Sequence, residues 1–281
     1  MRWRGGRQSN NVEDYRGRSG GTGMKFGIGG LVAVAAAYFF GIDPRIILGL
    51  MQATSGPTQV ENAETSQPAD EEGQFMSVVL ADTEDTWTAL FKARGLNYEQ
   101  PRLRLFTRGT QTGCGAAGSE AGPFYCPADH RVYIDLGFYR ELAQRFNAPG
   151  DFAQAYVLAH EVGHHVQNLL GTADKVRAAQ RGGGEQQSNQ LQVRMELQAD
   201  CYAGIWAHHA QRSRQVLEQG DIEEALGAAA AVGDDMIQKK TQGQVIPETF
   251  THGSAAQRQQ WFRRGFETGT LEGCDTFGAQ R

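Results

Sequence analysis

Two histidines and a glutamate near the middle of the chain have the spacing of a metal-dependent hydrolase motif. Residues 160–164 read His-Glu-Val-Gly-His, so His160 and His164 lie four positions apart. On a helix this separation places both imidazoles on one face, where they can bind a single metal ion. Glu161 is then positioned to take a proton from a water molecule on that metal. The spacing therefore predicts a catalytic zinc site in which Glu161 is the general base.

A third metal ligand is predicted from a later segment. Catalytic zinc sites that use two histidines commonly add a glutamate and leave one position for water. Glu196 and Asp200 lie four residues apart among apolar neighbours, where unpaired carboxylates are unfavourable. We therefore assign Glu196 as the third ligand, and Asp200 as the acceptor of the second N–H of a ligand histidine. The alternative is a solvated acidic face, which does not account for the apolar neighbours.

Two helices are needed to bring these side chains together. The first is expected to begin with a capping box at Asp151 and to end at Gly171, with an apolar stripe packed inward. The second is expected to begin at Ser188 or Asn189 and to carry Glu196. Facing helices of this kind would place the predicted ligands in a buried position.

Short strand patterns ahead of the first helix predict a small sheet. Residues 132–135 are rich in β-branched and aromatic side chains, and residues 103–107 have a similar pattern. We expect them to be neighbouring strands, with 132–135 as the outer strand along which an extended peptide is held. The compatible alternative is that both strands only close the core over the first helix.

These motifs resemble those of known zinc peptidases. The zinc motif followed by Glu196-Leu-Gln-Ala-Asp200 resembles the gluzincin group, which includes thermolysin and the integral-membrane CaaX- and HtpX-type proteases. Residues 122–129 (Gly-Pro-Phe-Tyr-Cys-Pro-Ala-Asp) and 251–258 (Thr-His-Gly-Ser-Ala-Ala-Gln-Arg) resemble the neutral zinc metallopeptidases of the YpfJ-like family, and the similarity covers nearly the whole chain. The resemblance implies a zincin-like fold and a peptidase activity, without naming a substrate.

The resemblance also implies two groups that assist the reaction. Peptide hydrolysis at zinc builds negative charge on the carbonyl oxygen, and a donor aimed there stabilises the transition state. The CaaX-type proteases have a histidine and an arginine at the separation of His252 and Arg258, which implies this role for both. Ser254 and Gln257 form a capping box at the start of the helix that follows His252. The alternatives are a histidine hydrogen-bonded within the turn and an arginine paired on the surface.

The N-terminal part of the chain predicts a membrane anchor. Residues 1–25 are polar and basic, residues 26–42 contain no charged side chain, and residues 43–74 form a linker. A cleaved signal peptide and a buried helix are the alternatives, but no small-residue cleavage site follows and a buried helix leaves the basic flank unexplained. We expect one transmembrane helix in the cytoplasmic membrane, with a cytoplasmic N-terminus and the catalytic domain, residues 75–281, outside.

The four cysteines all follow the apolar segment. An even count in an exported domain indicates disulfides. Of the three possible pairings we favour Cys114–Cys126 and Cys201–Cys274. A structural zinc site made by these thiols is the alternative, but the sequence lacks a C-x-x-C pair.

The expected protein is a membrane-anchored zinc endopeptidase that binds one Zn²⁺ per chain and acts on a peptide or protein substrate. Its expected fold class is α+β and zincin-like, mostly helical with a small antiparallel or mixed sheet, plus the transmembrane helix. A net charge of −5 over 281 residues gives no indication of nucleic-acid binding. Two alternatives are a zinc-binding scaffold without turnover, which would need neither Glu161 nor His252, and a zinc amidase or deacylase.

Overall fold

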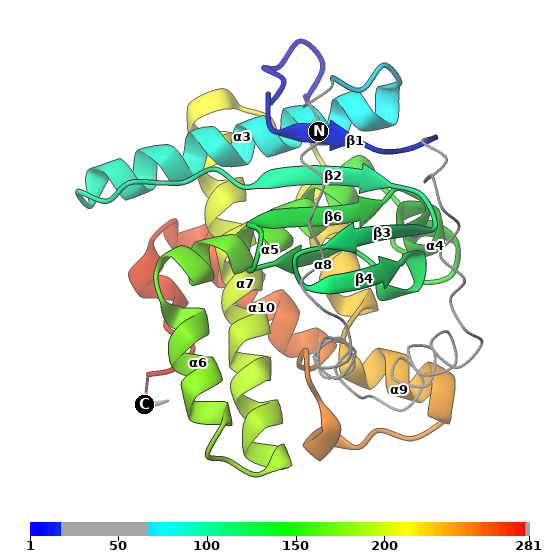
Figure 1. The fold of residues 1–281 in the computed structure, drawn as a ribbon, viewed down its shortest axis with the longest axis vertical. Coiled ribbons are helices and arrows are strands. Elements are labelled where there is room, and N and C mark those ends of the chain that lie inside the picture. Colours follow the sequence, from blue (N-terminus) through cyan, green and yellow to red (C-terminus); the bar gives the residue numbers. More distant parts are fainter. Residues whose placement is uncertain (18–66, 279–281) are drawn as a thin grey trace.

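The computed structural model describes residues 1–17 and 67–278, and helices dominate this part of the chain (Figure 1). The helices are α3 (Glu71–Ala93), α4 (Gly137–Gln144), α5 (Asp151–Leu169), α6 (Thr172–Gln180), α7 (Glu185–Arg214), α8 (Asp221–Ala231), α9 (Asp234–Gln242) and α10 (Ala255–Thr268). The strands are β1 (Val12–Asp14), β2 (Arg102–Phe106), β3 (Gly109–Thr112), β4 (Gly115–Gly118), β5 (Phe124–Cys126) and β6 (Arg131–Asp135). The prediction of a mostly helical fold with small sheets is confirmed.

The main sheet has the strand order β1-β2-β6-β5, with β1, β2 and β6 parallel and β5 antiparallel to β6. Strands β3 and β4 form a separate antiparallel hairpin. The expected pairing of 103–107 with 132–135 is present, but the expectation that 132–135 is the outer strand is wrong. Val132, Tyr133 and Ile134 in β6 are all 0% exposed, as in a central strand covered on both faces.

Residues 1–17 belong to the same folded unit as the helices. Strand β1 pairs with β2, and the N-terminal ammonium group of Met1 lies 2.7 Å from a carboxylate oxygen of Asp151 at the start of α5. Glu13 is fully buried and accepts hydrogen bonds from Arg104 at 2.6 Å and Arg131 at 3.2 Å. These contacts hold the N-terminal segment against the sheet.

The predicted single-pass topology is wrong. Within residues 1–17 and 67–278, every helix is too short or too polar to cross a bilayer. The segment 26–42, for which the transmembrane helix was expected, lies outside the described residues. A single crossing there would put β1 and β2 on opposite sides of a membrane, whereas they are neighbours in one sheet. The transmembrane part of the predicted fold class and the predicted location in the cytoplasmic membrane are therefore corrected.

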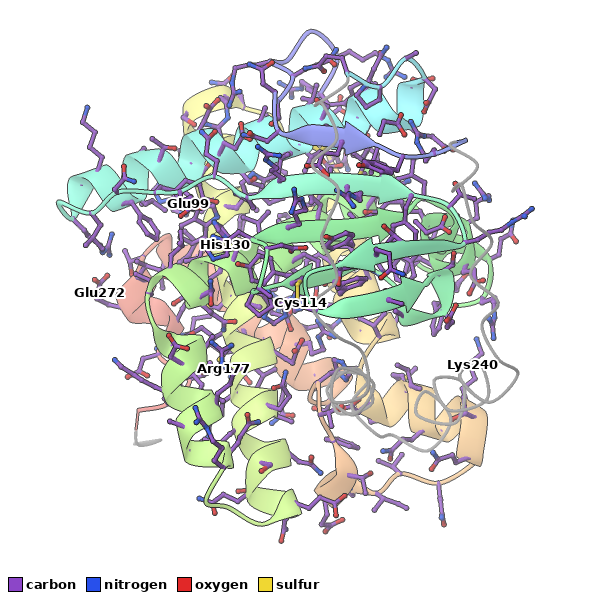
Figure 2. All side chains as sticks on the ribbon, in the orientation of Figure 1. Glu99, Cys114, His130, Arg177, Lys240 and Glu272 are labelled. Carbon is purple, nitrogen blue, oxygen red and sulfur yellow. A yellow bond between two sulfur atoms is a disulfide. The ribbon has the colours of Figure 1, made fainter. Side chains whose placement is uncertain are left out.

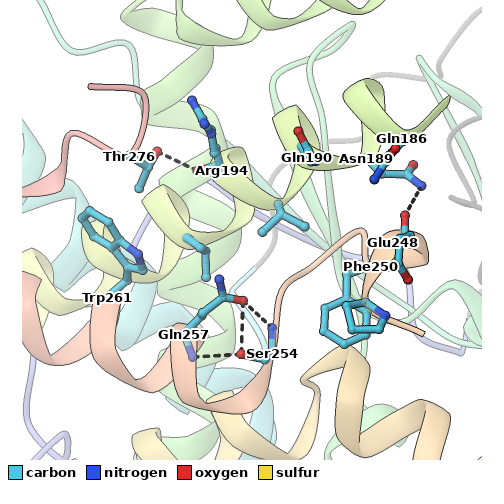
Figure 3. A pocket seen from close by; sticks show the side chains of 13 residues that line it. Gln186, Asn189, Gln190, Arg194, Glu248, Phe250, Ser254, Gln257, Trp261 and Thr276 are labelled. Atoms are coloured by element: carbon cyan, nitrogen blue, oxygen red, sulfur yellow. Dashed lines mark hydrogen bonds between the residues drawn. The ribbon is translucent and has the colours of Figure 1, made fainter. Parts of the chain in front are cut away.

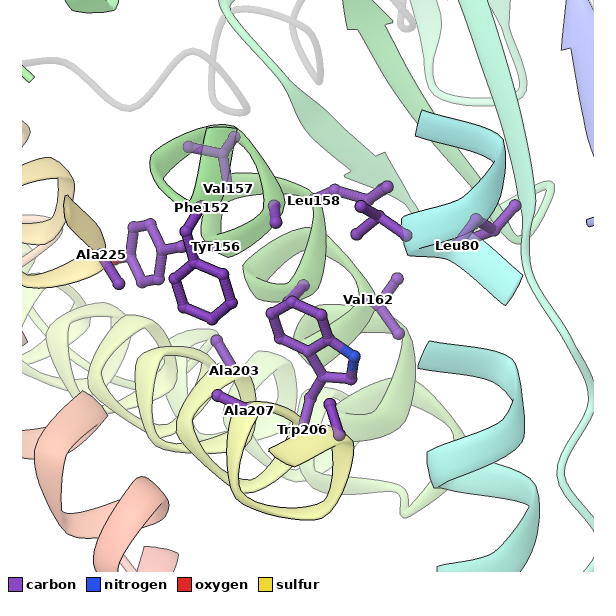
Figure 4. Close-up of a cluster of buried hydrophobic side chains, with 14 of the residues drawn as sticks. Leu80, Phe152, Tyr156, Val157, Leu158, Val162, Ala203, Trp206, Ala207 and Ala225 are labelled. Carbon is purple, nitrogen blue, oxygen red and sulfur yellow. The ribbon is translucent and has the colours of Figure 1, made fainter. Parts of the chain in front are cut away.

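Aromatic side chains between α5 and α7 form the centre of the core (Figure 4). Phe152 of α5 stacks on Trp206 of α7 with ring centroids 5.6 Å apart. The indole N–H of Trp206 donates to Asp82 of α3 at 2.6 Å, so this buried donor is satisfied. Tyr156 meets Phe262 of α10 edge-on at 5.5 Å. The core thus joins α3, α5, α7 and α10.

The backbones of helices α7 and α10 lie in direct contact where the helices cross, because glycines lie at the crossing. A Cβ atom at Gly265 would lie 1.9 Å from the carbonyl oxygen of Cys201, and one at Gly204 would lie 2.1 Å from that of Phe262. No side chain fits at these distances. Glycine at both positions is therefore what allows α10 to pack this closely on α7.

Two disulfides are present, and both have the pairing favoured from the sequence. Cys114–Cys126 ties the turn between β3 and β4 to β5, and Figure 2 shows Cys114 with its yellow sulfur bond beside the hairpin. Cys201–Cys274 ties the C-terminal tail to the middle of α7.

Candidate metal centre

The glycine within the zinc motif sets how closely α5 approaches α7. A Cβ atom at Gly163 would lie 3.0 Å from the carbonyl oxygen of Ala199, which is tighter than an ordinary contact. Because glycine has no Cβ atom, the α5 backbone lies against the stretch of α7 between Glu196 and Asp200. The predicted ligands on the two helices are thereby brought within reach of each other.

The three predicted metal ligands meet in one buried cluster. The Nε2 atom of His160 lies 3.2 Å from Oε2 of Glu196, and Nε2 of His164 lies 3.5 Å from the same oxygen. The exposed fractions of the three residues are 7%, 5% and 3% for His160, His164 and Glu196. Glu161 follows His160 on α5 and is 8% exposed. The three side chains expected to be ligands therefore lie together in one buried cluster.

Asp200 lies behind His160 and contacts its imidazole. The Nδ1–H group of His160 donates to Asp200 at 2.8 Å, so that Nε2 faces Glu196. Burial lowers the pKa of His160, but the charge of Asp200 and its hydrogen bond raise it to about 9. Burial likewise opposes ionisation of Asp200, but the guanidinium of Arg258 and the imidazole of His160 bring its pKa down to about 2. Asp200 is therefore an ionised acceptor that orients the ring of His160.

The partner of His164 is Gln167, a residue that the sequence analysis did not identify. Gln167 is fully buried, and its Oε1 atom accepts from Nδ1 of His164 at 2.9 Å. Position 167 is three residues after His164, so helical spacing alone places the two side chains together. Both histidines therefore have their Nδ1 atoms occupied and their Nε2 atoms turned toward Glu196.

The third histidine of the motif region has a structural position. His165 is fully buried, and its ring nitrogens contact the hydroxyl of Tyr125 at 3.0 Å and the carbonyl oxygen of Glu99 at 2.6 Å. Burial lowers its pKa to about 4, so the ring is neutral at pH 7. His165 attaches α5 to the sheet side of the molecule and is turned away from the cluster.

Arg258 is not placed to contact a substrate, which corrects the role implied by the resemblance. Its side chain is buried and donates to both carboxylate oxygens of Asp200 at 2.8 and 2.9 Å. A further N–H group donates to the hydroxyl of Tyr156 at 3.2 Å. Tyr156 itself donates to Asp200 at 2.5 Å. Arg258 thus stabilises the carboxylate that orients His160, and it acts from behind the cluster.

His252 lies in a turn that one carboxylate organises. Asp234 accepts hydrogen bonds from the backbone N–H groups of Thr251, His252 and Gly253 at 2.7, 2.6 and 2.9 Å, and it lies 3.2 Å from Nδ1 of His252. Burial lowers the pKa of His252, but Asp234 raises it by hydrogen bond and by charge. The charges of His252 and Glu196 act on each other's pKa, which places this imidazole within electrostatic range of the cluster. The side chain is 43% exposed and remains accessible to a substrate.

The donor set of the cluster fits zinc. Zinc binds histidine nitrogen and carboxylate oxygen at about 2.0–2.2 Å in tetrahedral geometry, which implies donor atoms about 3.3 Å apart. The nitrogen-to-oxygen distances of 3.2 and 3.5 Å match this spacing. Ligand atoms of all three side chains lie within 4.8 Å of one another. Two imidazoles held through Nδ1 and one carboxylate form a recurrent ligand set of catalytic zinc.

Comparison with known proteins assigns the family. The family described as "Putative neutral zinc metallopeptidase" matches residues 1–277. The chain belongs to this family. "Uncharacterized protein YpfJ" of Escherichia coli is 50% identical over 288 residues, which cover 99% of each chain. "Uncharacterized protein Rv2575" of Mycobacterium tuberculosis is 44% identical over 255 residues, covering 86% of this chain and 85% of that protein. No solved structure gives a significant match.

Membership in this neutral zinc metallopeptidase family implies zinc as the metal. The match begins at residue 1 and so includes β1, in agreement with the packing of the N-terminal segment on the sheet. It also includes both helices that carry the cluster.

A cavity of about 450 Å³ lies on the neighbouring face of α7 (Figure 3). Its walls are formed by the first half of α7, by the chain around Phe250 and by Trp261 of α10. Neither the histidines nor the carboxylates of the metal centre line it. The cavity is therefore separate from the cluster between α5 and α7.

Proposed function

We propose that the protein is a zinc-dependent endopeptidase that binds one Zn²⁺ per chain through His160, His164 and Glu196. The observation that carries this proposal is the buried cluster of two imidazoles and a carboxylate, with Glu161 directly after His160 on α5. A purely structural zinc site is usually closed by four protein ligands, whereas among residues 1–17 and 67–278 this cluster offers three. Three protein ligands leave one position for water, as hydrolysis requires.

Zinc, when bound, supplies a Lewis acid that polarises the peptide carbonyl and lowers the pKa of a water molecule toward about 7. Glu161 takes the proton of the attacking water and passes it to the leaving amine. Asp200 and Gln167 hold the two imidazoles in one tautomer, so that the ligand atoms keep their direction during the reaction.

His252 is the residue proposed to stabilise the charge that develops on the substrate carbonyl oxygen. Its Nδ1 atom is held by Asp234, which leaves Nε2 as the atom available to a substrate. The raised pKa of His252 favours its protonated form, which is the better donor to an oxyanion. Losing a single donor of this kind typically costs about 2.7–4 kcal/mol of transition-state stabilisation.

The test compares three variants of the full chain for zinc content and for cleavage of casein and a peptide library, with a chelator control. Glu161→Gln should keep zinc and lose hydrolysis, because an amide cannot accept the proton. Glu196→Ala should lose zinc. Glu141→Gln, at an exposed glutamate of α4, should match the wild type in both measurements.

Three outcomes would contradict the proposal. Retained hydrolysis in Glu161→Gln would remove the general base, and full zinc occupancy in Glu196→Ala would remove the third ligand. A wild-type chain that binds zinc and cleaves no peptide, but cleaves amides of small molecules or cell-wall fragments, would identify an amidase instead.

A further inference from the structure

A series of buried hydrogen bonds connects the metal-centre histidine His164 with the C-terminal tail. Gln167 Oε1 lies 2.9 Å from Nδ1 of His164, and Gln167 Nε2 donates to Oε1 of Gln198 at 3.1 Å. Gln198 Nε2 in turn donates to the carbonyl oxygen of Cys274 at 3.0 Å. The exposed fractions of His164, Gln167, Gln198 and Cys274 are 5%, 0%, 6% and 0%, so bulk water does not substitute for these contacts.

Backbone carbonyl groups fix the direction of every hydrogen bond in this series. A carbonyl oxygen only accepts, so the amide nitrogen of Gln198 must face Cys274 and its oxygen must face Gln167. The amide nitrogen of Gln167 is fixed in the same way, because it also donates to the carbonyl oxygen of Met195 at 2.7 Å. The oxygen of Gln167 is therefore the atom that faces His164.

This direction decides which nitrogen of His164 carries the proton. An amide oxygen only accepts, so Nδ1 of His164 must be the N–H group. In the neutral ring Nε2 then has the lone pair, and Nε2 is the atom that lies 3.5 Å from Glu196. The two glutamines thus hold His164 in the tautomer and orientation that a metal ligand needs.

The far end of the series depends on the tail, and the tail is fastened to α7. The Cys201–Cys274 disulfide joins the residue that supplies the carbonyl oxygen to α7 itself. Two residues further on, Thr276 donates to the carbonyl oxygen of Arg194 at 2.8 Å. The position of the Cys274 carbonyl is therefore set by a covalent bond one helical turn after Gln198.

We propose that Gln167 and Gln198 are positioning residues of the zinc site, and that the Cys201–Cys274 disulfide holds the carbonyl group that orients them. The inference rests on the proposed zinc site and adds to it a dependence on the C-terminal tail. His160 is oriented by a charged carboxylate, whereas His164 is oriented by neutral amides, which add no charge to the centre.

The experiment measures two properties of the purified full chain that do not require peptidase activity. One is the dissociation constant of Zn²⁺, obtained by competition with a chromophoric chelator. The other is the visible absorption spectrum of the Co²⁺-substituted protein, which reports ligand geometry. Gln167→Met keeps the side-chain volume and should weaken zinc binding about 10–100-fold, the usual effect of losing the partner of a ligand histidine. Gln198→Met should weaken it about tenfold or less, since Gln167 keeps its bond to Met195. Both variants should change the Co²⁺ spectrum.

The effect of the Cys201–Cys274 disulfide is tested against a matched control, the Cys114–Cys126 disulfide. Cys201→Ala with Cys274→Ala should weaken zinc binding to about the same extent as Gln198→Met. Cys114→Ala with Cys126→Ala removes a disulfide beside the hairpin and should leave zinc affinity within about twofold of the wild type.

Unchanged zinc affinity and an unchanged Co²⁺ spectrum in Gln167→Met and Gln198→Met would overturn the inference, even if both variants unfold more readily. If the Cys201→Ala, Cys274→Ala chain does not fold, Gln198→Met decides the matter alone. A wild-type chain that binds no zinc would overturn the proposed function itself, whereas zinc bound equally by the wild type and these variants would overturn only this inference.

Discussion

Asp200 and Arg258 form a buried ion pair behind His160. Removing one of the two charges tests whether this ion pair stabilises the candidate metal centre. Asp200 is 0% exposed and Arg258 is 4% exposed, and two N–H groups of the arginine lie 2.8 and 2.9 Å from the carboxylate. Asp200→Asn keeps the shape and removes the charge, which leaves a buried guanidinium without its counter-ion. Breaking such a pair from one side costs about 3–5 kcal/mol.

The double variant Asp200→Asn, Arg258→Met should be less destabilised than the sum of the single variants, because neither charge is then left alone. We expect a coupling energy toward the upper end of the range of about 0.5–3 kcal/mol seen for residues in contact. Since domains are commonly stable by about 5–15 kcal/mol, both single variants should still fold. Zinc affinity should fall about 10–100-fold in Asp200→Asn, because His160 loses its charged acceptor.

The stability assay is urea unfolding of chelator-treated protein, and zinc affinity is measured separately by competition. Glu141 and Arg145 provide the control, since this pair lies 3.1 Å apart on the surface of α4 with both side chains more than half exposed. Its coupling energy should be only about 0.3–0.5 kcal/mol. A coupling energy for Asp200 and Arg258 no larger than that of the surface pair would refute the role of the ion pair. Wild-type zinc affinity in Asp200→Asn would refute the role of Asp200 in orienting His160.

Two further variants test the helix packing and the N-terminal segment. Gly163→Ala must push α5 from α7 by a few tenths of an ångström, since its Cβ would lie 3.0 Å from a backbone oxygen. Zinc binding should weaken about tenfold and stability should fall by up to about 1–3 kcal/mol. The control Gly227→Ala has no atom within 4 Å of its Cβ, so it should gain up to about 1 kcal/mol and bind zinc normally. Burial opposes ionisation of Glu13, but Arg104 and Arg131 lower its pKa below the usual value. Its contribution to stability is therefore present above the unfolded-state pKa of about 4.3 and is lost as the pH falls below that value. In urea unfolding from pH 7 to pH 3, Glu13→Gln should be less stable than wild type at pH 7, and the difference should shrink toward pH 3; a constant difference would contradict this.

Helical spacing is a local property, so the sequence alone predicts which side chains share a helix face. His160 and His164 share a face of any helix that contains them, and the capping box of Ser254 and Gln257 is present in the structure. Gln167 could have been found by the same rule. These features need no knowledge of the rest of the fold.

Features that depend on distant contacts could not be predicted in this way. Asp151 was expected to cap α5, but the N-cap is Gly150, and the carboxylate of Asp151 binds the ammonium group of Met1 instead. The N–H group of Phe152 donates to Glu224 of α8. Because these partners are remote in sequence, local spacing contains no information about them.

The start of α7 and the place of β6 in the sheet also differ from what the sequence predicts. Helix α7 begins at Glu185, which precedes the expected caps Ser188 and Asn189. The sequence between the glycine loop and these residues contains no signal that opposes a helix, so the helix is three residues longer than expected. Strand β6 was expected at the edge, but its partners β2 and β5 lie on both sides of it. A run of apolar residues identifies a strand and does not state how many neighbours it has.

The burial of Asp200 explains the position of Arg258. Asp200 is 0% exposed, and the guanidinium of Arg258 donates to both of its carboxylate oxygens. Without Arg258 this buried carboxylate would lose its counter-charge, which is unfavourable in a site shielded from water. Arg258 is therefore needed against Asp200, and of the two residues proposed to assist the reaction only His252 has a largely accessible side chain, at 43% exposure.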